Sequence, residues 1–188
     1  MNGHRRTSAP DMRAMMEDSL EVLRIYRHDL MNQVQLLQAY SQLKKYERLN
    51  DPIQALVKEA QRHTEWSAIP SSMVSYVVLS RDIKFQMLQL HVSYEQQEEP
   101  TEAAEWLAVR LLGSLLDSLG ETSKTLLEPL PIDVWIVSFR QGYEIGWFAD
   151  VPHDWAAWAM AFAGEGVELV QEPVEDGIEY RVRFQLQE

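Results

Sequence analysis

The stretch MEDSLEVLRIYRHDLMNQVQLL, residues 16–37, decides the first half of the fold. It lies within residues 11–48, which contain neither glycine nor proline. Its apolar side chains recur in steps of three and four, the spacing that places them on one face of an α-helix. This apolar stripe consists of Met16, Leu20, Leu23, Leu30, Val34 and Leu37, and Arg27 occupies the stripe position between Leu23 and Leu30. We therefore expect one long amphipathic helix of roughly 55 Å.

A second helix, ending near residue 66, is expected after the break Asn50-Asp51-Pro52. Asp51 is a favourable N-cap, Pro52 suits the first helical position, and Gln54 completes a capping-box pattern. The apolar face of this helix consists of Ile53, Leu56, Val57 and Ala60. Two helices are too thin to bury the apolar stripe. We therefore expect residues 11–68 to form a helical hairpin that dimerises as a four-helix bundle.

Beyond a linker at residues 69–72, the pattern changes to a mixture of helices and strands. Gln141-Gly142 reads as the turn of a β-hairpin. The expected helices cover residues 72–87, 101–119 and 153–163, and the expected strands cover residues 88–95, 132–139, 143–148, 167–171 and 178–186. The chain is thus predicted to be α+β. A loose tail (residues 1–10) and the helical hairpin precede an α/β domain (residues 69–188).

The composition excludes several classes of function. The net charge of -12 makes nucleic acid a poor partner. The absence of cysteine excludes disulfides and thiolate metal sites, and it is compatible with a cytoplasmic location. No run of about 18 apolar residues is present, and no apolar segment follows the N-terminal tail. We therefore expect neither a membrane span nor a signal peptide.

His28 is the residue with the strongest candidate chemistry. At about 100° per residue it lies about 130° from the centre of the apolar stripe, so it should face solvent. Arg24, Asn32, Gln35 and Gln42 continue the same polar row. A neutral imidazole nitrogen can attack phosphorus and form a phosphoramidate that is easily passed on. Such transfer depends mainly on positioning and on neutralising charge.

Two neighbours could assist the imidazole. Asp29 could hold a charge beside the ring, and Asn32, one turn further on, could donate a hydrogen bond. An isolated surface histidine is nevertheless more often a solvated residue than a reactive one. The remaining histidines share no metal-ligand spacing, so we expect no metal site in this chain. These are His4, His63, His91 and His153.

The segment RHDLMNQVQLL, residues 27–37, resembles the phospho-acceptor helix of sensor histidine kinases of the citrate/fumarate-sensing type. It is most similar to the sporulation initiation phosphotransferase B family of Bacillus-type phosphorelays, and LKKYER, residues 43–48, continues the likeness. The resemblance implies a homodimeric four-helix bundle followed by a domain like a kinase ATP-binding domain. It also implies transfer of a phosphoryl group from the aspartate of one response regulator to His28, and then to the aspartate of another.

The resemblance also implies roles for the residues around His28. His28 would be the phospho-acceptor, with Asp29 and Asn32 beside it as catalytic residues. The receiver domain of a regulator would dock over the polar row and contact Arg24, Arg27 and Gln35. Because the chain shows no metal site of its own, we expect the Mg²⁺ for transfer to come from the acidic pocket of the regulator.

The C-terminal half departs from the kinases at one decisive place. Residues 112–118, LGSLLDS, resemble the kinase helix that carries Gly-Asn-Leu-Leu-Asp-Asn, but Ser114 and Ser118 replace both asparagines. Serine is shorter and has no amide carbonyl to hold the magnesium that bridges nucleotide phosphates. The glycine-rich lid motifs are also missing, so no backbone cradle for phosphates is visible. We therefore expect no binding or hydrolysis of ATP.

Two other interpretations stay open on the sequence. The chain could be a fragment of an active sensor histidine kinase, in which case nucleotide would label His28. It could instead be a non-catalytic dimeric scaffold that binds a regulator without accepting phosphate from it. Trp147, Trp155 and Trp158 could suggest a ligand site, but the spacing of three between the last two favours packing in a core.

Overall fold

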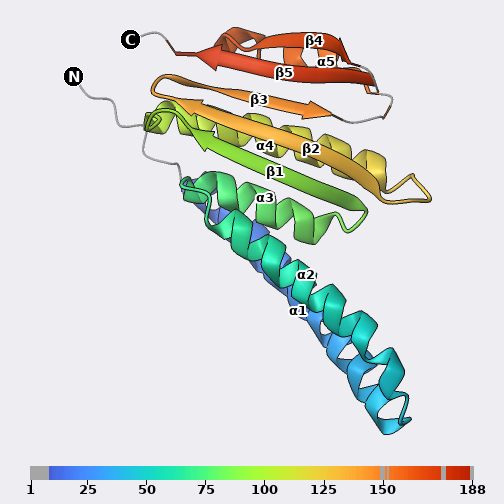
Figure 1. Ribbon diagram of the computed structural model, residues 1–188. Helices are drawn as coiled ribbons and strands as arrows, with labels where there is room; N and C mark the ends of the chain where they lie inside the picture. Colours follow the sequence, from blue (N-terminus) through green and yellow to red (C-terminus); the bar gives the residue numbers. More distant parts are fainter. Residues whose placement is uncertain (1–8, 149–150, 152, 175–176, 187–188) are drawn as a thin grey trace. The chain divides into compact units, whose positions relative to one another are not determined.

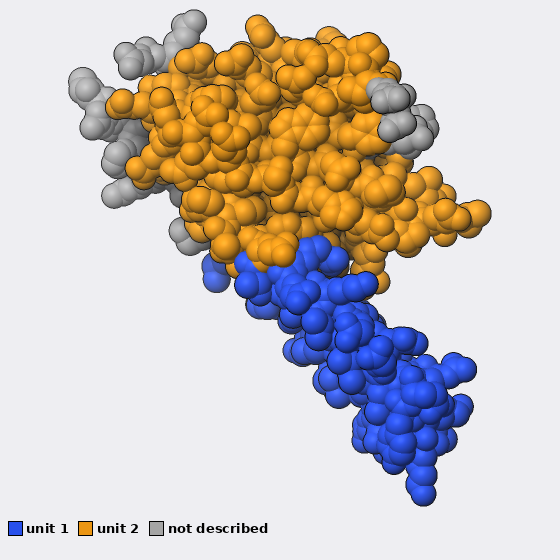
Figure 2. All heavy atoms as spheres, viewed as in Figure 1, with its two compact units in different colours: residues 1–64 blue, residues 65–188 orange. Residues whose placement is uncertain are grey.

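The protein consists of two compact units, residues 1–64 and 65–188, which are coloured separately in Figure 2. The computed structural model describes residues 9–148, 151, 153–174 and 177–186 (Figure 1). The predicted tail at residues 1–10 lies mostly outside the described residues. Its last two residues, Ala9 and Pro10, already belong to the first helix. None of the helices in the described part of the chain is both long enough and apolar enough to cross a membrane.

Unit 1 is the expected pair of helices. Helix α1 spans Ala9–Gln42, a short 3-10 turn η1 spans Tyr46–Arg48, and α2 spans Asn50–Ser67, whose last residues belong to unit 2. The two helices run alongside each other (Figure 1), and the rings of Tyr26 and His63 lie 6.1 Å apart. The long stretch without glycine or proline accounts for the length of α1.

The prediction of one helix over residues 11–48 is wrong at its end, because the chain turns at Lys44. The Lys44 N–H donates to the Ser41 carbonyl at 3.0 Å, and the Lys45 N–H donates to the Tyr40 carbonyl at 2.9 Å. This is the Schellman pattern of helix termination. Lys44 has φ 54°, the left-handed conformation that usually selects glycine at this position. The end of α1 therefore has no sequence signal.

Helix α2 begins at Asn50, two residues before the predicted first helical residue Pro52. Asn50 is already helical, so Asp51 lies in the first turn rather than at the cap. A carboxylate in the first turn of a helix is still favourable, because it faces the positive end of the helix dipole. Pro52 is buried and also lies in the first turn, where its missing N–H costs no helical hydrogen bond.

Unit 2 contains a mixed five-stranded sheet in the order β1-β2-β3-β5-β4. Strands β1 and β2 are parallel, and the other pairs are antiparallel. The parallel pair is connected through helix α4, Glu102–Ser123, as parallel pairing requires. The strands are β1 Leu88–Gln96, β2 Leu130–Phe139, β3 Gly142–Phe148, β4 Glu168–Val174 and β5 Gly177–Gln185.

Helices cover one face of this sheet, as Figure 1 shows for α3 and α4. Helix α3 spans Ser72–Lys84, α5 spans Trp155–Met160, and a 3-10 turn η2 spans Ala163–Glu165. Side-chain caps fix two of the helix starts: Ser71 Oγ accepts the Val74 N–H at 3.0 Å, and Asp154 Oδ1 accepts the Ala157 N–H at 2.9 Å. A helical N-terminal region followed by a mixed sheet confirms the predicted α+β class.

The core of unit 2 lies between the sheet and helices α3, α4 and α5. One side of α4 contributes leucines that are almost completely buried: Leu111, Leu112, Leu115, Leu116 and Leu119. The predicted packing role of the tryptophans is confirmed, since Trp147, Trp155 and Trp158 are all buried. Their rings meet edge to face, with centroids 5.1–6.0 Å apart.

The β2–β3 hairpin turns one residue earlier than predicted. Its two-residue loop is Arg140-Gln141, and Gly142 already pairs with Phe139 as the first residue of β3. Glycine is required there by the approach of β5, because a Cβ on Gly142 would lie 2.0 Å from the Phe184 carbonyl oxygen.

Candidate functional site

His28 lies near the middle of α1, and 73% of its side chain is exposed. The exposure predicted from the helical spacing is therefore confirmed. A residue in the interior of a long helix has its backbone held on both sides by helical hydrogen bonds. The imidazole is thus presented to solvent from a rigid support, which is the positioning that group transfer needs.

Both hydrogen-bond contacts of the imidazole involve the same ring nitrogen. His28 Nδ1 lies 3.0 Å from Asp29 Oδ1 and 3.3 Å from Asn32 Nδ2. A protonated Nδ1 donates to the carboxylate, whereas an unprotonated Nδ1 accepts from the amide, so the two contacts suit different tautomers. The closer and charged partner favours the first tautomer. In that form the lone pair of the neutral ring is on Nε2.

Three different faces of α1 carry three different kinds of side chain. The side that meets α2 holds the least exposed residues, among them Val22, Ile25 and Tyr40. The apolar stripe lies on another side and is largely exposed, for example at Leu23 (61%) and Val34 (44%). The face that carries His28 is polar. At about 100° per residue, these faces lie about 110–130° apart.

The predicted docking residues do not all share the face of His28. Arg24 and Gln35 are exposed and lie within about 40° of His28 around the helix. Arg27 is also exposed, but it lies about 100° away, within the line of the apolar stripe. Asp29 is less exposed than His28, with 35% of its side chain accessible. The helix therefore brings Arg24, Asn32 and Gln35 to one surface with His28 and separates Arg27 from them.

In the helix that resembles the kinase nucleotide helix, Ser114 makes a contact through its side chain, whereas the contact of Ser118 is made by its backbone. Ser114 Oγ accepts the Trp158 Nε1–H at 2.9 Å, which joins α4 to α5. The Ser118 carbonyl accepts the Thr122 hydroxyl at 3.0 Å. Between these serines, Asp117 accepts two hydrogen bonds from the Arg81 guanidinium at 3.0 and 3.1 Å.

A second link joins α4 to the segment that follows α5. The Arg110 guanidinium pairs with both carboxylate oxygens of Glu165 at 2.8 and 3.0 Å, and it lies 5.8 Å from the centre of the Phe162 ring. Sequence reasoning missed this link and the Trp158–Ser114 hydrogen bond. The partners are 55 and 44 residues apart, and no local pattern joins them.

Within the described ranges of the chain, no group of three or more His, Cys, Asp or Glu side chains is arranged to hold a metal ion. The imidazole of His91 pairs with Asp133, and His63 lies against Tyr26, so each of these histidines has a separate environment.

Residues 12–69 match the family described as "Sensor_kinase_SpoOB-type, alpha-helical domain". This range contains most of α1 and all of α2, including His28. The N-terminal region is therefore similar to the α-helical domain of SpoOB-type sensor kinases. No curated protein matches the chain.

Among solved structures, the chain is similar to several histidine kinases at low sequence identity. Acinetobacter baumannii histidine kinase AdeS has a TM-score of 0.46 and 9% identity, over 86% of this chain and 98% of that one. Histidine kinase ThkA, in complex with response regulator protein TrrA, has a TM-score of 0.42 and 12% identity, over 92% of this chain. This chain spans only 63% of the length of that ThkA chain. Such distant likenesses carry no conclusion about function.

Proposed function

We propose that this protein is a histidine phosphotransferase of a sporulation-type phosphorelay. It would take a phosphoryl group from the aspartate of one response regulator onto His28 and pass it to the aspartate of another. The observation that carries the proposal is the exposed imidazole in the interior of α1, with Asp29 and Asn32 at its Nδ1. The match of residues 12–69 to a sensor-kinase helical domain supports the same reading.

The first step follows from the tautomer that Asp29 favours. With Nδ1–H donating to the carboxylate, the Nε2 lone pair attacks the phosphorus of the regulator's acyl phosphate. The bond between phosphorus and the aspartate oxygen breaks, and its electron pair stays on the regulator's carboxylate. The phosphorylated ring keeps its Nδ1 proton and carries a positive charge. Asp29 lies 3.0 Å from that nitrogen and stabilises this charge.

The second step is the reverse reaction on a different partner. A carboxylate oxygen of the second regulator attacks the phosphorus, the P–N bond breaks, and its electron pair returns to Nε2. No proton has to enter or leave the ring in either step, so His28 is regenerated in its starting tautomer. Asn32 Nδ2 lies 3.3 Å from the same nitrogen and can donate to it only in the other tautomer, so Asn32 is not used as a donor to the ring in this cycle. The transfer is thus reversible, because both the phosphoramidate and the acyl phosphate are high-energy forms.

The docking of the regulator is assigned to the face of α1 that carries His28. Arg24 and Gln35 flank His28 on this face, so they are the side chains expected to meet the receiver domain. Arg27 lies in line with the apolar stripe, at the edge of the proposed dimer interface. It could therefore contact a receiver domain only at the edge of the docking surface. In this proposal the acidic pocket of the regulator supplies the Mg²⁺ that neutralises the moving phosphoryl group.

The homodimer is part of the proposal because the apolar stripe of α1 is largely exposed among the described residues of unit 1. Ile53 and Val57 on α2 are also exposed, at 43% and 41%. Two hairpins that bring these faces together form a four-helix bundle, and the His28 face stays outside because it points elsewhere. A cytoplasmic location belongs to the same proposal.

Unit 2 is proposed to work without ATP. Ser114 is engaged by the Trp158 indole of α5, and Trp158 packs against the buried rings of Trp147 and Trp155. The acidic character of the unit is also unfavourable for a polyanionic nucleotide. Calorimetry with Mg-ATP should show no measurable binding. A micromolar dissociation constant, or labelling of His28 from ATP, would favour the alternative of an active sensor histidine kinase.

The experiment that tests the relay uses two response regulators, one of them phosphorylated, with the full chain between them. Label should pass to the chain and then to the second regulator, and it should also pass back. His28→Gln should abolish both transfers while the helical circular dichroism is unchanged, because glutamine is tolerated well on an exposed helix.

The matched control is His153→Gln, which removes a histidine from unit 2 and should leave the transfer rate unchanged. If His28→Gln still relays phosphate, then His28 is not the carrier. If the wild-type chain accepts no phosphate from any regulator, the alternative of a non-catalytic scaffold gains support instead.

A further inference from the structure

The sheet of unit 2 has a second face that its helices do not cover. On β1 the residues of this face, Gln89, His91, Ser93 and Glu95, are exposed, whereas Leu88 and Leu90 of the opposite face are buried. On β2 the same face carries Asp133, which is exposed, and Trp135, which is half-buried. We call this the open face of the sheet.

Trp135 lies flat on the open face because its neighbour on β3 is a glycine. Trp135 pairs with Gly146, and a Cβ built on Gly146 would lie 2.0 Å from atoms of the indole ring. Any larger residue at position 146 would therefore push the ring away from the sheet. The glycine thus allows the indole to spread over β3, with one face of the ring turned away from the backbone.

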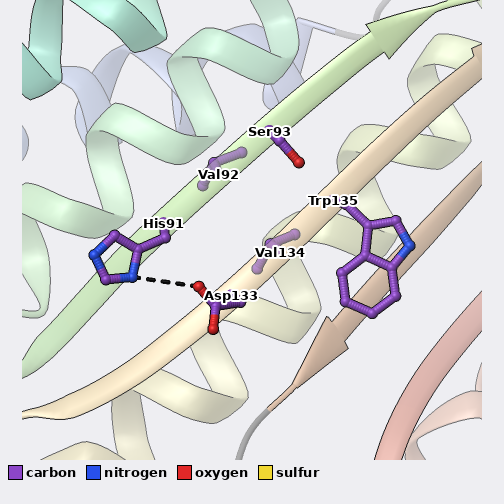
Figure 3. A pocket seen from close by; sticks show the side chains of 6 residues that line it. All are labelled: His91, Val92, Ser93, Asp133, Val134 and Trp135. Atoms are coloured by element: carbon purple, nitrogen blue, oxygen red, sulfur yellow. Dashed lines mark ion pairs between the residues drawn. The ribbon is translucent and has the colours of Figure 1, made fainter.

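A shallow depression of about 230 Å³ lies beside this indole, between β1 and β2 (Figure 3). His91, Ser93, Asp133 and Trp135 contribute side chains to it. His91 Nδ1 lies 3.4 Å from Asp133 Oδ1, and the carboxylate is 66% exposed. Figure 3 shows the Ser93 hydroxyl and the His91 ring pointing away from each other, so they do not form a nucleophile and base.

The open face is acidic and already holds guanidinium groups. By the strand register, six carboxylates and two guanidinium groups project from its described residues, a net charge of -4. Arg181 has Glu144, Glu172 and Glu179 around it. The Arg183 guanidinium lies 5.9 Å from the centre of the Phe139 ring. The carboxylates are Glu95, Asp133, Glu144, Glu168, Glu172 and Glu179.

We propose that the depression beside Trp135 binds an arginine side chain of a basic segment in a partner protein. The guanidinium would stack on the exposed face of the Trp135 indole, the aromatic ring that attracts cations best. Its N–H groups would donate to the Asp133 carboxylate, which lies 3.4 Å from His91 Nδ1 on β1. The carboxylates of the open face attract a basic segment electrostatically before contact is made.

The charge of the open face selects this occupant over a second copy of the chain. Two copies that meet through this face would bring -4 against -4, which opposes association. The phosphoryl-bearing pocket of a receiver domain is itself acidic and is a poor match for the same reason. The proposal is therefore independent of the phosphotransfer proposed at His28.

An NMR titration of the full chain tests this proposal. The probe is a capped tetra-arginine peptide, and the matched control is a capped tetra-citrulline peptide of nearly the same shape without charge. The indole N–H signal of Trp135 is identified by its loss in Trp135→Phe. Tetra-arginine should shift this signal to saturation, and tetra-citrulline should not. Asp133→Asn should weaken binding by about fivefold.

Glu128→Gln is the control variant, because it removes the same charge from an exposed loop elsewhere in unit 2. It should weaken binding by less than about twofold. Equal weakening by both substitutions would show general attraction between charges and overturn the proposal. So would the absence of any shift at Trp135. A shift of the Trp135 signal on raising the protein concentration alone would assign the face to a second copy instead.

Discussion

The two units of this protein differ in both charge and burial. Residues 1–64 contain ten Lys or Arg and eight Asp or Glu, a net charge of +2, whereas residues 65–188 contain seven and 21, a net charge of -14. Unit 2 buries almost all the leucines of one side of α4. Unit 1 leaves Met16, Leu20 and Leu23 more than half exposed. The acidic balance of the chain therefore resides entirely in unit 2.

The two units therefore gain their stability in different ways. Unit 2 has a core of its own between sheet and helices, whereas the described part of unit 1 has a largely exposed apolar surface. An exposed apolar stripe of this length on a helix indicates an interaction surface. The weakly basic hairpin is also the better partner for an acidic receiver domain, because the charge of unit 2 repels such a domain. We therefore propose unit 1 for both assembly and phosphotransfer.

The largest effect is expected from a charge placed in the apolar stripe. Val34→Asp should dissociate the dimer or unfold the hairpin, because burial of an unpaired carboxylate costs several kcal/mol. Leu30→Asp should act in the same way. Light scattering at micromolar concentration measures the change. Gln35→Asp, on the His28 face one residue away, is the control and should remain dimeric. A wild-type chain that is monomeric at this concentration would remove the argument for the bundle.

The next effect concerns the core of unit 2. Leu115 is fully buried on α4, so Leu115→Ala should lower the free energy of unfolding by about 2–5 kcal/mol. Leu127 is fully exposed, and Leu127→Ala should change it by less than about 0.5 kcal/mol. Denaturant unfolding followed by tryptophan fluorescence reports on this unit, because the buried tryptophan cluster belongs to it. Equal effects of the two substitutions would contradict the contrast between core and surface.

The smallest effect is a gain in stability at the end of α1. Lys44 adopts a left-handed conformation that costs a side-chain-bearing residue about 1 kcal/mol relative to glycine. Lys44→Gly should therefore raise the free energy of unfolding of unit 1 by up to about 1 kcal/mol. Lys45→Gly, at a neighbouring position with φ -89°, should not stabilise the protein. Thermal unfolding of helical signal compares the two variants, and a loss of stability in Lys44→Gly would show that the turn is not fixed in this way.

Local patterns in the sequence predicted the elements but not the contacts between them. The helical periodicity around Leu23, Leu30 and Val34 predicted α1 and the outward direction of His28. It failed at Lys44, because a lysine in the left-handed conformation has none of the local signals of a helix end. The spacing of Trp155 and Trp158 predicted their common direction and their burial.

Features that depend on contacts between distant residues could not be predicted from local sequence patterns. The parallel pairing of β1 with β2 and the position of β5 between β3 and β4 arise from the packing of the whole sheet. The hydrogen bond from Trp158 to Ser114 and the packing of the Trp135 ring over Gly146 also join residues that are distant in the sequence or lie on different strands. At the candidate site, the sequence predicted that Asp29 and Asn32 would lie beside the imidazole. It did not predict that both would approach the same nitrogen, Nδ1.

In the proposed relay, His28 carries a phosphoryl group on Nε2 between two regulators. The most direct measurement is NMR of the chain after incubation with a phosphorylated response regulator and no ATP, with ¹⁵N in its histidines. The account predicts a phosphoramidate at Nε2 of His28 that disappears when an unphosphorylated second regulator is added. A phosphoryl group on a different residue, or none at any regulator concentration, would contradict the account.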